Sequence, residues 1–158
     1  MDGWLILAIT RVLQIRQKMF WNKKILFLGY NHEQTSLIDK IKFYKKEWHI
    51  KQTNKKINLI TAKKFESIIS FGYRHVIDKH IIDNLGYPII NLHISFLPYN
   101  RGTHPNFWSF AENTPSGISI HETDYGVDTG RIIYKKKIDF ELFKNRKNLT
   151  FSKTYEKL

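Results

Sequence analysis

The 158-residue sequence contains no cysteine, so it can form neither a disulfide framework nor a thiolate nucleophile. It also has little hydrophobic sequence near its start: the apolar segment 4–9 is much shorter than the ~20 residues that cross a bilayer. This segment follows Asp2 rather than a basic residue and precedes no small-residue cleavage site, unlike a secretory signal. We therefore expect a cytoplasmic protein without a membrane span.

Two kinds of ligand-binding motif are missing as well. No Gly-x-Gly-x-x-Gly follows the first expected strand and no P-loop occurs, so neither an NAD nor an ATP role is supported. The seven histidines include no His-x-x-x-His on a helix, and His121-Glu122 is an isolated pair. These absences predict chemistry without a metal ion.

The first 22 residues stand apart, because a strand-like segment begins shortly after Met19. We interpret residues 1–22 as an N-terminal appendage or a mis-assigned start, with Met19 as an alternative initiator. A membrane-surface helix is the other interpretation, with Arg11, Arg16 and Lys18 as its basic residues. Residues 23–158 then form one domain, since the chain is too short for two ordinary domains.

The formal net charge is +12, mostly from lysines in residues 40–64 and 135–157. They lack the interleaved arginines and aromatic residues of a nucleic-acid surface, so the charge does not predict a nucleic-acid partner. A solvated, lysine-rich exterior explains the charge. A positive field that attracts an anionic substrate or cofactor is a second explanation, and both can hold.

Strand-like and helix-like segments alternate along the chain. The expected strands are 24–28, 67–71, 89–94, 117–121 and 131–140, with a weaker signal in 48–60. Apolar helical faces are expected at Leu37, Ile38, Ile41 and Tyr44 and at Val76, Ile77, His80, Ile81 and Leu85. Further helices are expected at 106–112 and 149–158. This order predicts an α/β fold with an open, Rossmann-like, mainly parallel sheet and helices on both faces.

Asn91 and His93 lie two residues apart in the strand 89–94, so their side chains share one face of the sheet. They also lie near the carboxyl end of the strand, where open α/β sheets bind their ligands. On the Asn-x-His triplet alone, however, hydrogen bonding to loop backbone is the more common role. The triplet indicates a site only together with other signals.

A second signal is the loop 122–130, which holds three carboxylates and two glycines directly after a strand. Glu122 and Asp124 are equally consistent with a solvated turn. Asp128 differs, because Thr-Gly and a strand follow it and would hold its side chain at the sheet edge. We therefore expect Asp128 to border the same cleft as Asn91 and His93.

Four motifs occur in a fixed order: Asn91-Leu92-His93-Ile94-Ser95-Phe96-Leu97-Pro98, Arg101-Gly102, Gly117 to His121, and Val127-Asp128-Thr129-Gly130. In this the chain resembles the formyltransferases that use N10-formyltetrahydrofolate, over residues 24–158 and most strongly over 67–133. The resemblance implies that N10-formyltetrahydrofolate is the co-substrate. It also implies that the catalytic residues are Asn91, His93 and Asp128.

The resemblance further implies a pterin site between two loops, formed largely by backbone groups. Its residues would be Phe71, Gly72, Tyr73, Arg74, Glu122, Asp124 and Asp128.

Residues 70–75 and 105–110 are most similar to enzymes that formylate dTDP-linked 4-amino-4,6-dideoxy sugars. This implies a nucleotide-linked amino sugar as the acceptor. Two alternatives stay open: an enzyme similar to methionyl-tRNA formyltransferase, and a non-catalytic, truncated folate-binding remnant. Residues 154–158 resemble the start of a helix beyond which family members continue, so we expect a truncated C-terminal region and a homodimer only in a full-length form.

Overall fold

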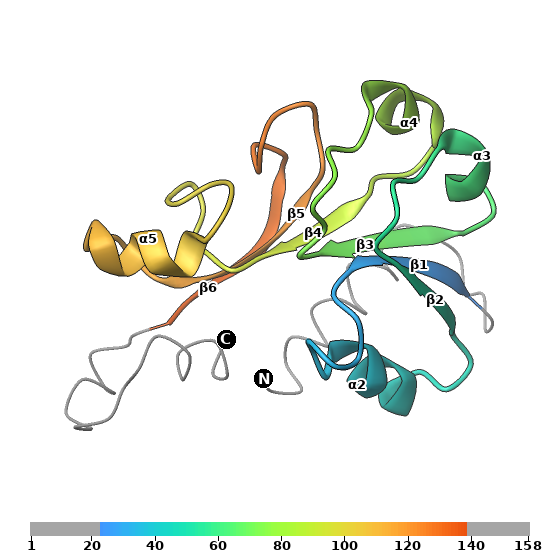
Figure 1. Ribbon diagram of the computed structural model, residues 1–158, viewed down its shortest axis with the longest axis horizontal. Coiled ribbons are helices and arrows are strands. Elements are labelled where there is room, and N and C mark those ends of the chain that lie inside the picture. The colour runs from blue at the N-terminus through green and yellow to red at the C-terminus, as the bar shows by residue number, and fades with distance from the viewer. Residues whose placement is uncertain (1–22, 139–158) are drawn as a thin grey trace.

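The computed structural model describes residues 23–138. Its elements are β1 (Lys24–Gly29), α2 (Leu37–Tyr44), β2 (His49–Thr53), α3 (Leu59–Ala62), β3 (Ser67–Phe71), α4 (Lys79–Asn84), β4 (Ile90–His93), α5 (Pro105–Ala111), β5 (Gly117–Glu122) and β6 (Ile132–Lys137) (Figure 1). The predicted appendage 1–22, the predicted helix 149–158 and the end of the predicted strand 131–140 lie outside the described residues.

The described strands form one six-stranded sheet in the order β2-β1-β3-β4-β5-β6. The strands from β2 to β4 pair in parallel, whereas β4 with β5 and β5 with β6 pair antiparallel. The predicted open, mainly parallel α/β sheet is confirmed. The reversal of direction between β4 and β5 was not predicted.

Helices cover both faces of the sheet, as predicted (Figure 1). Successive side chains of a strand point to opposite faces. In β1, Ile25 and Phe27 therefore pack into the cluster that contains the buried face of α2. Leu26 and Leu28 pack into the other cluster, with residues of α3 and α4. Both clusters consist of fully or nearly fully buried aliphatic and aromatic side chains, which stabilise the sheet between its two helical layers.

Each of the two predicted apolar helical faces includes a residue that is exposed in the structure. Tyr44 is the last residue of α2 and is 56% exposed, with its ring edge-on to Phe43 rather than in the core. Val76 is 81% exposed and precedes α4, which begins only at Lys79 after Asp78 adopts an extended conformation. The assignment of Val76 to this helix was wrong, because a periodic apolar pattern does not reveal where the backbone first becomes helical.

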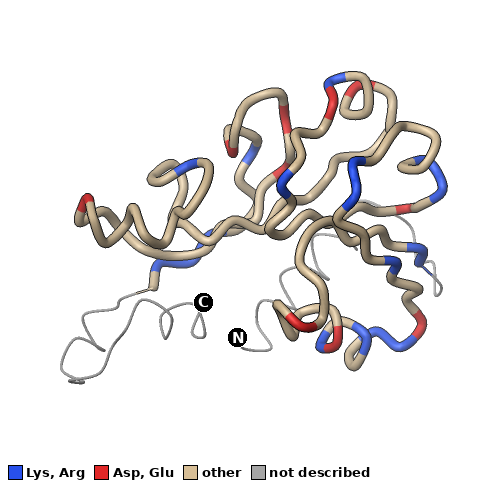
Figure 2. Tube along the Cα trace, in the orientation of Figure 1, with Lys and Arg blue, Asp and Glu red and all other residues tan. Residues whose placement is uncertain are grey.

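The basic residues are dispersed over the described chain rather than gathered on one element (Figure 2). For example, β6 carries Lys135, Lys136 and Lys137, while Lys55 and Lys56 follow β2. In residues 23–138, no helix has both the length and the apolar character to span a bilayer.

Candidate active site

The predicted site residues of β4 lie beside the first antiparallel strand. Leu92 belongs to the cluster on the α2 side, so Asn91 and His93 point to the opposite face of the sheet. Asn91 is the direct cross-strand partner of His121 in β5. Because paired residues project to the same face, His121 joins Asn91 and His93 there.

Asp128 connects these three side chains. Asn91 Nδ2 donates a hydrogen bond to Asp128 Oδ1 at 3.0 Å. His121 Nε2 lies 3.3 Å from the same oxygen, and His93 Nδ1 lies 3.5 Å from Asp128 Oδ2. The structure thus brings the three predicted catalytic side chains together with His121, and we refer to these four as the polar cluster.

The backbone around Asp128 is held tightly. Asp128 has a φ of 52°, in the left-handed region, and its Oδ2 accepts a hydrogen bond from the Gly102 backbone N–H at 2.9 Å. Two residues further, a Cβ at Gly130 would lie 1.8 Å from the carbonyl oxygen of Glu122. Only glycine permits this approach, which places Asp128 at the carboxyl edge of the sheet.

The other two carboxylates of the loop bond to residues of the loop or to Arg131, which follows it. Glu122 Oε1 accepts a hydrogen bond from Arg131 Nη2 at 2.6 Å. Asp124 Oδ1 accepts from the Gly126 N–H at 3.1 Å and from Thr129 Oγ1 at 2.6 Å. Both side chains therefore shape the loop, and their predicted contacts with folate stay predictions.

His121 was assigned no role from the sequence. It is only 2% exposed, and its Nδ1 lies 2.8 Å from the carbonyl oxygen of Glu122, so Nδ1 carries a proton. In the neutral ring, Nε2 accepts from Asn91 Nδ2, which is 3.0 Å away, and in the protonated ring it donates to Asp128 Oδ1 at 3.3 Å. The alternation in residues 117–121 was a signal, but only antiparallel pairing places His121 opposite Asn91.

Burial and neighbouring charges oppose each other in setting the pKa values of Asp128 and His93. Burial alone would raise the pKa of Asp128, but hydrogen bonds and charges from His121, His93 and Gly102 outweigh it and hold the pKa below its ordinary value of 3.8. Burial lowers the pKa of His93 below its ordinary 6.5, although Asp128 and the carbonyl of Asn100 oppose this shift. At neutral pH the cluster therefore holds a carboxylate beside a neutral imidazole.

The predicted folate segment 71–74 begins at Phe71, the last residue of β3, and continues into the loop that follows. The Phe71 ring lies in the core, edge-on to Tyr30 with centroids 5.0 Å apart, and Gly72 lies against the Tyr30 ring. Tyr73 Oη donates to the carbonyl of Lys55 at 2.9 Å, which ties the loop to the segment after β2. Arg74 is exposed. This loop lies at the same carboxyl edge of the sheet as the polar cluster, because β3 and β4 run parallel.

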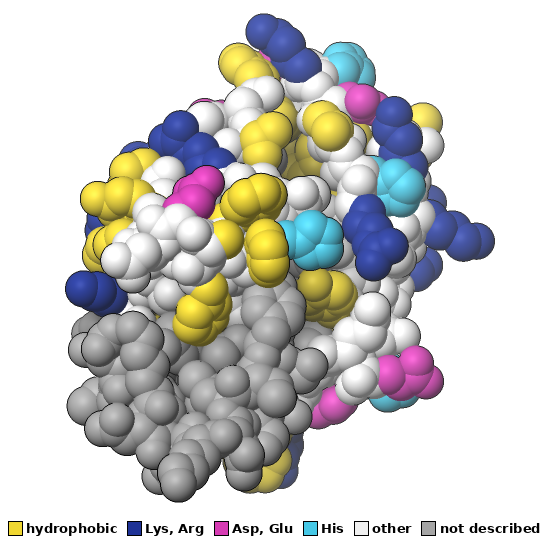
Figure 3. All heavy atoms as spheres, turned by 60° about the vertical axis from the view of Figure 1, so that its left-hand side comes forward, with side chains coloured by type: hydrophobic (Ala, Val, Ile, Leu, Met, Phe, Trp, Pro, Cys, Tyr) yellow, Lys and Arg dark blue, Asp and Glu magenta, His cyan; other side chains and the backbone are white. Residues whose placement is uncertain are grey.

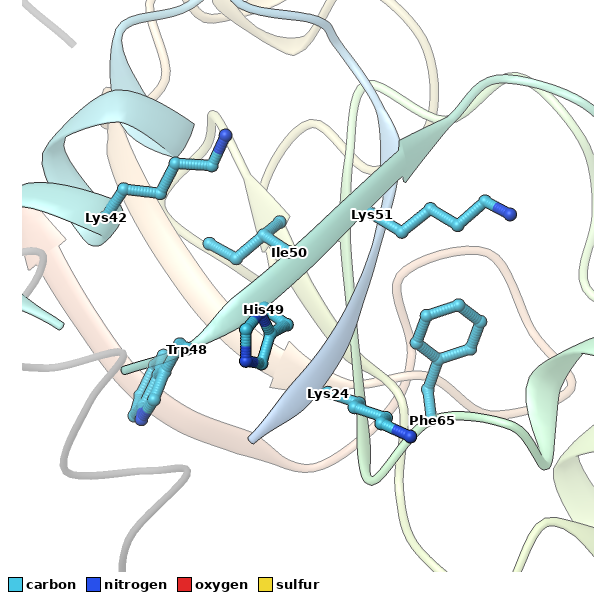
Figure 4. Close-up of a pocket in the computed structure, with 7 residues that line it drawn as sticks. All are labelled: Lys24, Lys42, Trp48, His49, Ile50, Lys51 and Phe65. Atoms are coloured by element: carbon cyan, nitrogen blue, oxygen red, sulfur yellow. The ribbon is translucent and has the colours of Figure 1, made fainter. Parts of the chain in front are cut away.

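A cavity of about 420 Å³ lies at the other end of the sheet, near the start of β1 and β2 (Figure 4). It is lined by Lys24, Lys42, Trp48, His49, Ile50, Lys51 and Phe65. Ile50 packs on the α2 side, so its neighbour Lys51 points to the other face of β2. Its position separates this cavity from the polar cluster, and the lysines do not converge on one point.

An open α/β sheet that gathers an amide, two imidazoles and a carboxylate at its carboxyl edge has the arrangement of an α/β enzyme site. The profile of the formyl transferase family matches residues 22–151. The chain therefore belongs to the formyl transferase family, which confirms the resemblance seen in its motifs.

Relatives with two kinds of acceptor in their names resemble the chain. Methionyl-tRNA formyltransferase of Rickettsia canadensis is 34% identical over 91 residues, which is 57% of this chain and 30% of the relative. The dTDP-4-amino-4,6-dideoxyglucose formyltransferase of Mycobacterium bovis is 32% identical over 80 residues, 51% of this chain and 33% of the relative. The chain thus spans about a third of these curated relatives.

Solved structures match this chain over a larger share of its length. The formyltransferase PseJ from Anoxybacillus kamchatkensis, solved in complex with UDP-4,6-dideoxy-4-formamido-L-AltNAc and tetrahydrofolate, has a TM-score of 0.71. It is 38% identical, and the match covers 85% of this chain and 67% of that one. A sugar N-formyltransferase from Shewanella, at 20% identity and a TM-score of 0.63, shares the fold over 74% of this chain and 57% of that one.

Proposed function

We propose that this protein transfers the formyl group of N10-formyltetrahydrofolate to the amine of a nucleotide-linked amino sugar. The observation that carries the proposal is the polar cluster, in which a carboxylate lies within 3.5 Å of an amide and two imidazoles. The similarity to PseJ, solved with a formamido nucleotide sugar and tetrahydrofolate, supports this choice of donor and acceptor.

The reaction needs a donor for a negative oxygen and an acceptor for a proton. The amine attacks the formyl carbon, a C–N bond forms, and the formyl oxygen becomes negative in the tetrahedral intermediate. Asn91 Nδ2 carries two N–H groups, one directed at Asp128 Oδ1 and the other at His121 Nε2. We assign the N–H that faces His121 to the oxyanion, which replaces His121 as its acceptor, a contact worth about 10²-fold or more in rate.

His93 and Asp128 suit the proton transfer. A buried, neutral His93 accepts the proton that leaves the amine, and the Asp128 carboxylate stabilises the imidazolium that forms. General acid–base help of this kind contributes roughly 10²–10⁴-fold in rate. The proton finally moves to N10 of the folate as the C–N10 bond breaks, so tetrahydrofolate leaves as a neutral amine.

We place the binding surfaces for the pterin and the nucleotide at the same edge of the sheet as the polar cluster. We assign the pterin to the loops 71–74 and 122–128. The nucleotide then lies toward α5, which exposes Phe107, Trp108 and Phe110. Hydrophobic side chains gather beside histidine and basic side chains on the face that Figure 3 turns forward. Aromatic rings suit a base and positive charge suits a diphosphate.

An acceptor panel tests the proposal. With formyl-folate as donor, UDP-linked and dTDP-linked 4-amino sugars and methionyl-tRNA would each be assayed for formyl transfer, with the Asp128→Asn variant as the inactive control. We expect transfer to a nucleotide sugar. Transfer to methionyl-tRNA alone would favour the second candidate, which the 34% identity to that enzyme supports. Folate binding without transfer to any acceptor would indicate a non-catalytic protein.

A further inference from the structure

His93 lies between two hydrogen-bond acceptors. Its Nε2 is 3.0 Å from the carbonyl oxygen of Asn100, and its Nδ1 is 3.5 Å from Asp128 Oδ2. Both partners can only accept, but the 3.0 Å contact with the carbonyl has hydrogen-bond geometry whereas the 3.5 Å contact with the carboxylate is long, so in the neutral ring Nε2 carries the proton. The nitrogen that is left to gain and lose a proton is therefore Nδ1, on the side of Asp128.

Asn100 presents its carbonyl group from an uncommon backbone conformation. Its φ of 51° lies in the left-handed region, which asparagine adopts more readily than most residues other than glycine. Its side chain is anchored by the segment that follows α5: Oδ1 accepts from Thr114 Oγ1 at 2.6 Å, and Nδ2 donates to Glu112 Oε2 at 3.2 Å. Contacts remote from His93 thus fix the direction of the carbonyl.

We infer that Asn100 is a positioning residue that fixes the tautomer of His93, so that Nδ1 is the atom that takes the proton released in formyl transfer. Nε2–H stays on the Asn100 carbonyl throughout, while Nδ1 takes the amine proton beside Asp128 and later gives it to N10 of the folate. The catalytic part of this inference rests on the proposed function. The tautomer itself is a property of the protein alone.

The matched pair of variants Asn100→Val and Asn100→Gly tests whether Asn100 fixes the tautomer of His93. Valine strongly disfavours a positive φ, whereas glycine adopts it freely while losing the side-chain anchors. In the full chain labelled with ¹⁵N-histidine, NMR reports which ring nitrogen of His93 is protonated, with the signal assigned by its loss in His93→Gln. We expect the proton on Nε2 in the unaltered protein, a mixture of tautomers in Asn100→Val, and a smaller share of the Nδ1–H tautomer in Asn100→Gly, which keeps the backbone conformation but loses the anchors.

Turnover supplies the second readout. For Asn100→Val we expect kcat to fall about tenfold, as for other partners that orient a histidine, with KM for formyl-folate changed less than about twofold. Gly86→Val controls for backbone strain, because Gly86 has a φ of 84° and a Cβ there would meet open space. It should change neither the tautomer nor kcat.

Thr114→Val removes one anchor of Asn100 without placing valine at a positive φ, and it replaces Asn100→Val if that variant does not fold. It should give a share of the Nδ1–H tautomer no larger than that of Asn100→Gly, which loses both anchors. A proton on Nδ1 in the unaltered protein overturns the inference, as does an unchanged Nε2–H signal and kcat in the folded valine variants. If the NMR signals show the expected tautomer but the protein does not transfer the formyl group, the proposed function is contradicted. The positioning of His93 by Asn100 is then still supported.

Discussion

At the scale of single residues, the polar cluster depends on Asp128, the one carboxylate that contacts all three of its other members. In the reaction proposed above, the folate binds before the formyl oxygen becomes negative. Groups directed at that oxygen and at the departing proton therefore act on the transition state more than on the bound complex.

We expect Asn91→Ala, His93→Ala and Asp128→Asn each to lower kcat by roughly 10²-fold, about 3 kcal/mol of barrier, with little change in formyl-folate affinity. A double substitution should cost less than the sum, because the groups act on one event. Steady-state kinetics and folate titration measure both quantities.

Glu122→Gln is the matched control in the same loop. It weakens the contact with Arg131, whose side chain is largely exposed, so its effect on kcat should be small. Near-normal turnover in both His93→Ala and Asp128→Asn would contradict the mechanism while leaving the family assignment intact.

The lowered pKa of His93 predicts a pH dependence of stability. Below pH 6.5 the unfolded chain binds a proton at His93, whereas the folded protein does so only at lower pH. The contribution of His93 to stability is therefore complete above pH 6.5 and declines as the pH falls toward the folded pKa.

Thermal melts at pH 7.5 and 5.5 test this. The drop in Tm should be smaller in His93→Gln than in the unaltered protein, and His32→Gln, at an exposed position, controls for the loss of a histidine as such. An equal drop in His93→Gln and the unaltered protein would show that His93 does not titrate in this way.

At the scale of elements, the loop between β5 and β6 positions Asp128 through the close approach of Gly130 to Glu122. We expect Gly130→Ala to destabilise the fold by about 2 kcal/mol or more and to lower kcat, because the added Cβ meets backbone that cannot move aside. Denaturant unfolding and the formyl-transfer assay measure the two effects.

Gly86→Ala is the comparison, since its Cβ would enter open space and only the positive φ is unfavourable. It should cost about 1 kcal/mol and leave kcat unchanged. Equal unfolding energies for Gly130→Ala and Gly86→Ala would show that the loop relaxes around the added methyl group.

At the scale of the whole molecule, the net charge of +12 is expected to assist an anionic nucleotide-sugar substrate through a long-range field rather than through one salt bridge. KM for the nucleotide sugar should rise several-fold as the salt concentration rises from 0.02 to about 0.3 M, because the Debye length shortens. The kcat value should barely change. A KM independent of salt would leave the lysines as a solvated exterior only.

Much of the architecture was determined by the sequence itself. Runs such as Ile25-Leu26-Phe27-Leu28 must be buried on both faces, and the alternation of strands with helices leaves few arrangements other than a mainly parallel sheet. The shared face of Asn91 and His93 follows from the two-residue period of a strand. For these features the burial of apolar side chains and the geometry of a strand determine both the local pattern and the tertiary fold.

The full set of contacts in the polar cluster depends on the tertiary structure. The antiparallel register of β4 and β5 sets His121 opposite Asn91, and the left-handed turns at Asn100 and Asp128 aim a carbonyl and a carboxylate at His93. Together with the hydrogen bond from Asn91 to Asp128, these contacts join residues from 7 to 37 positions apart. A periodic pattern reports which side of an element is buried, whereas strand direction and loop conformation depend on the packing of the whole chain.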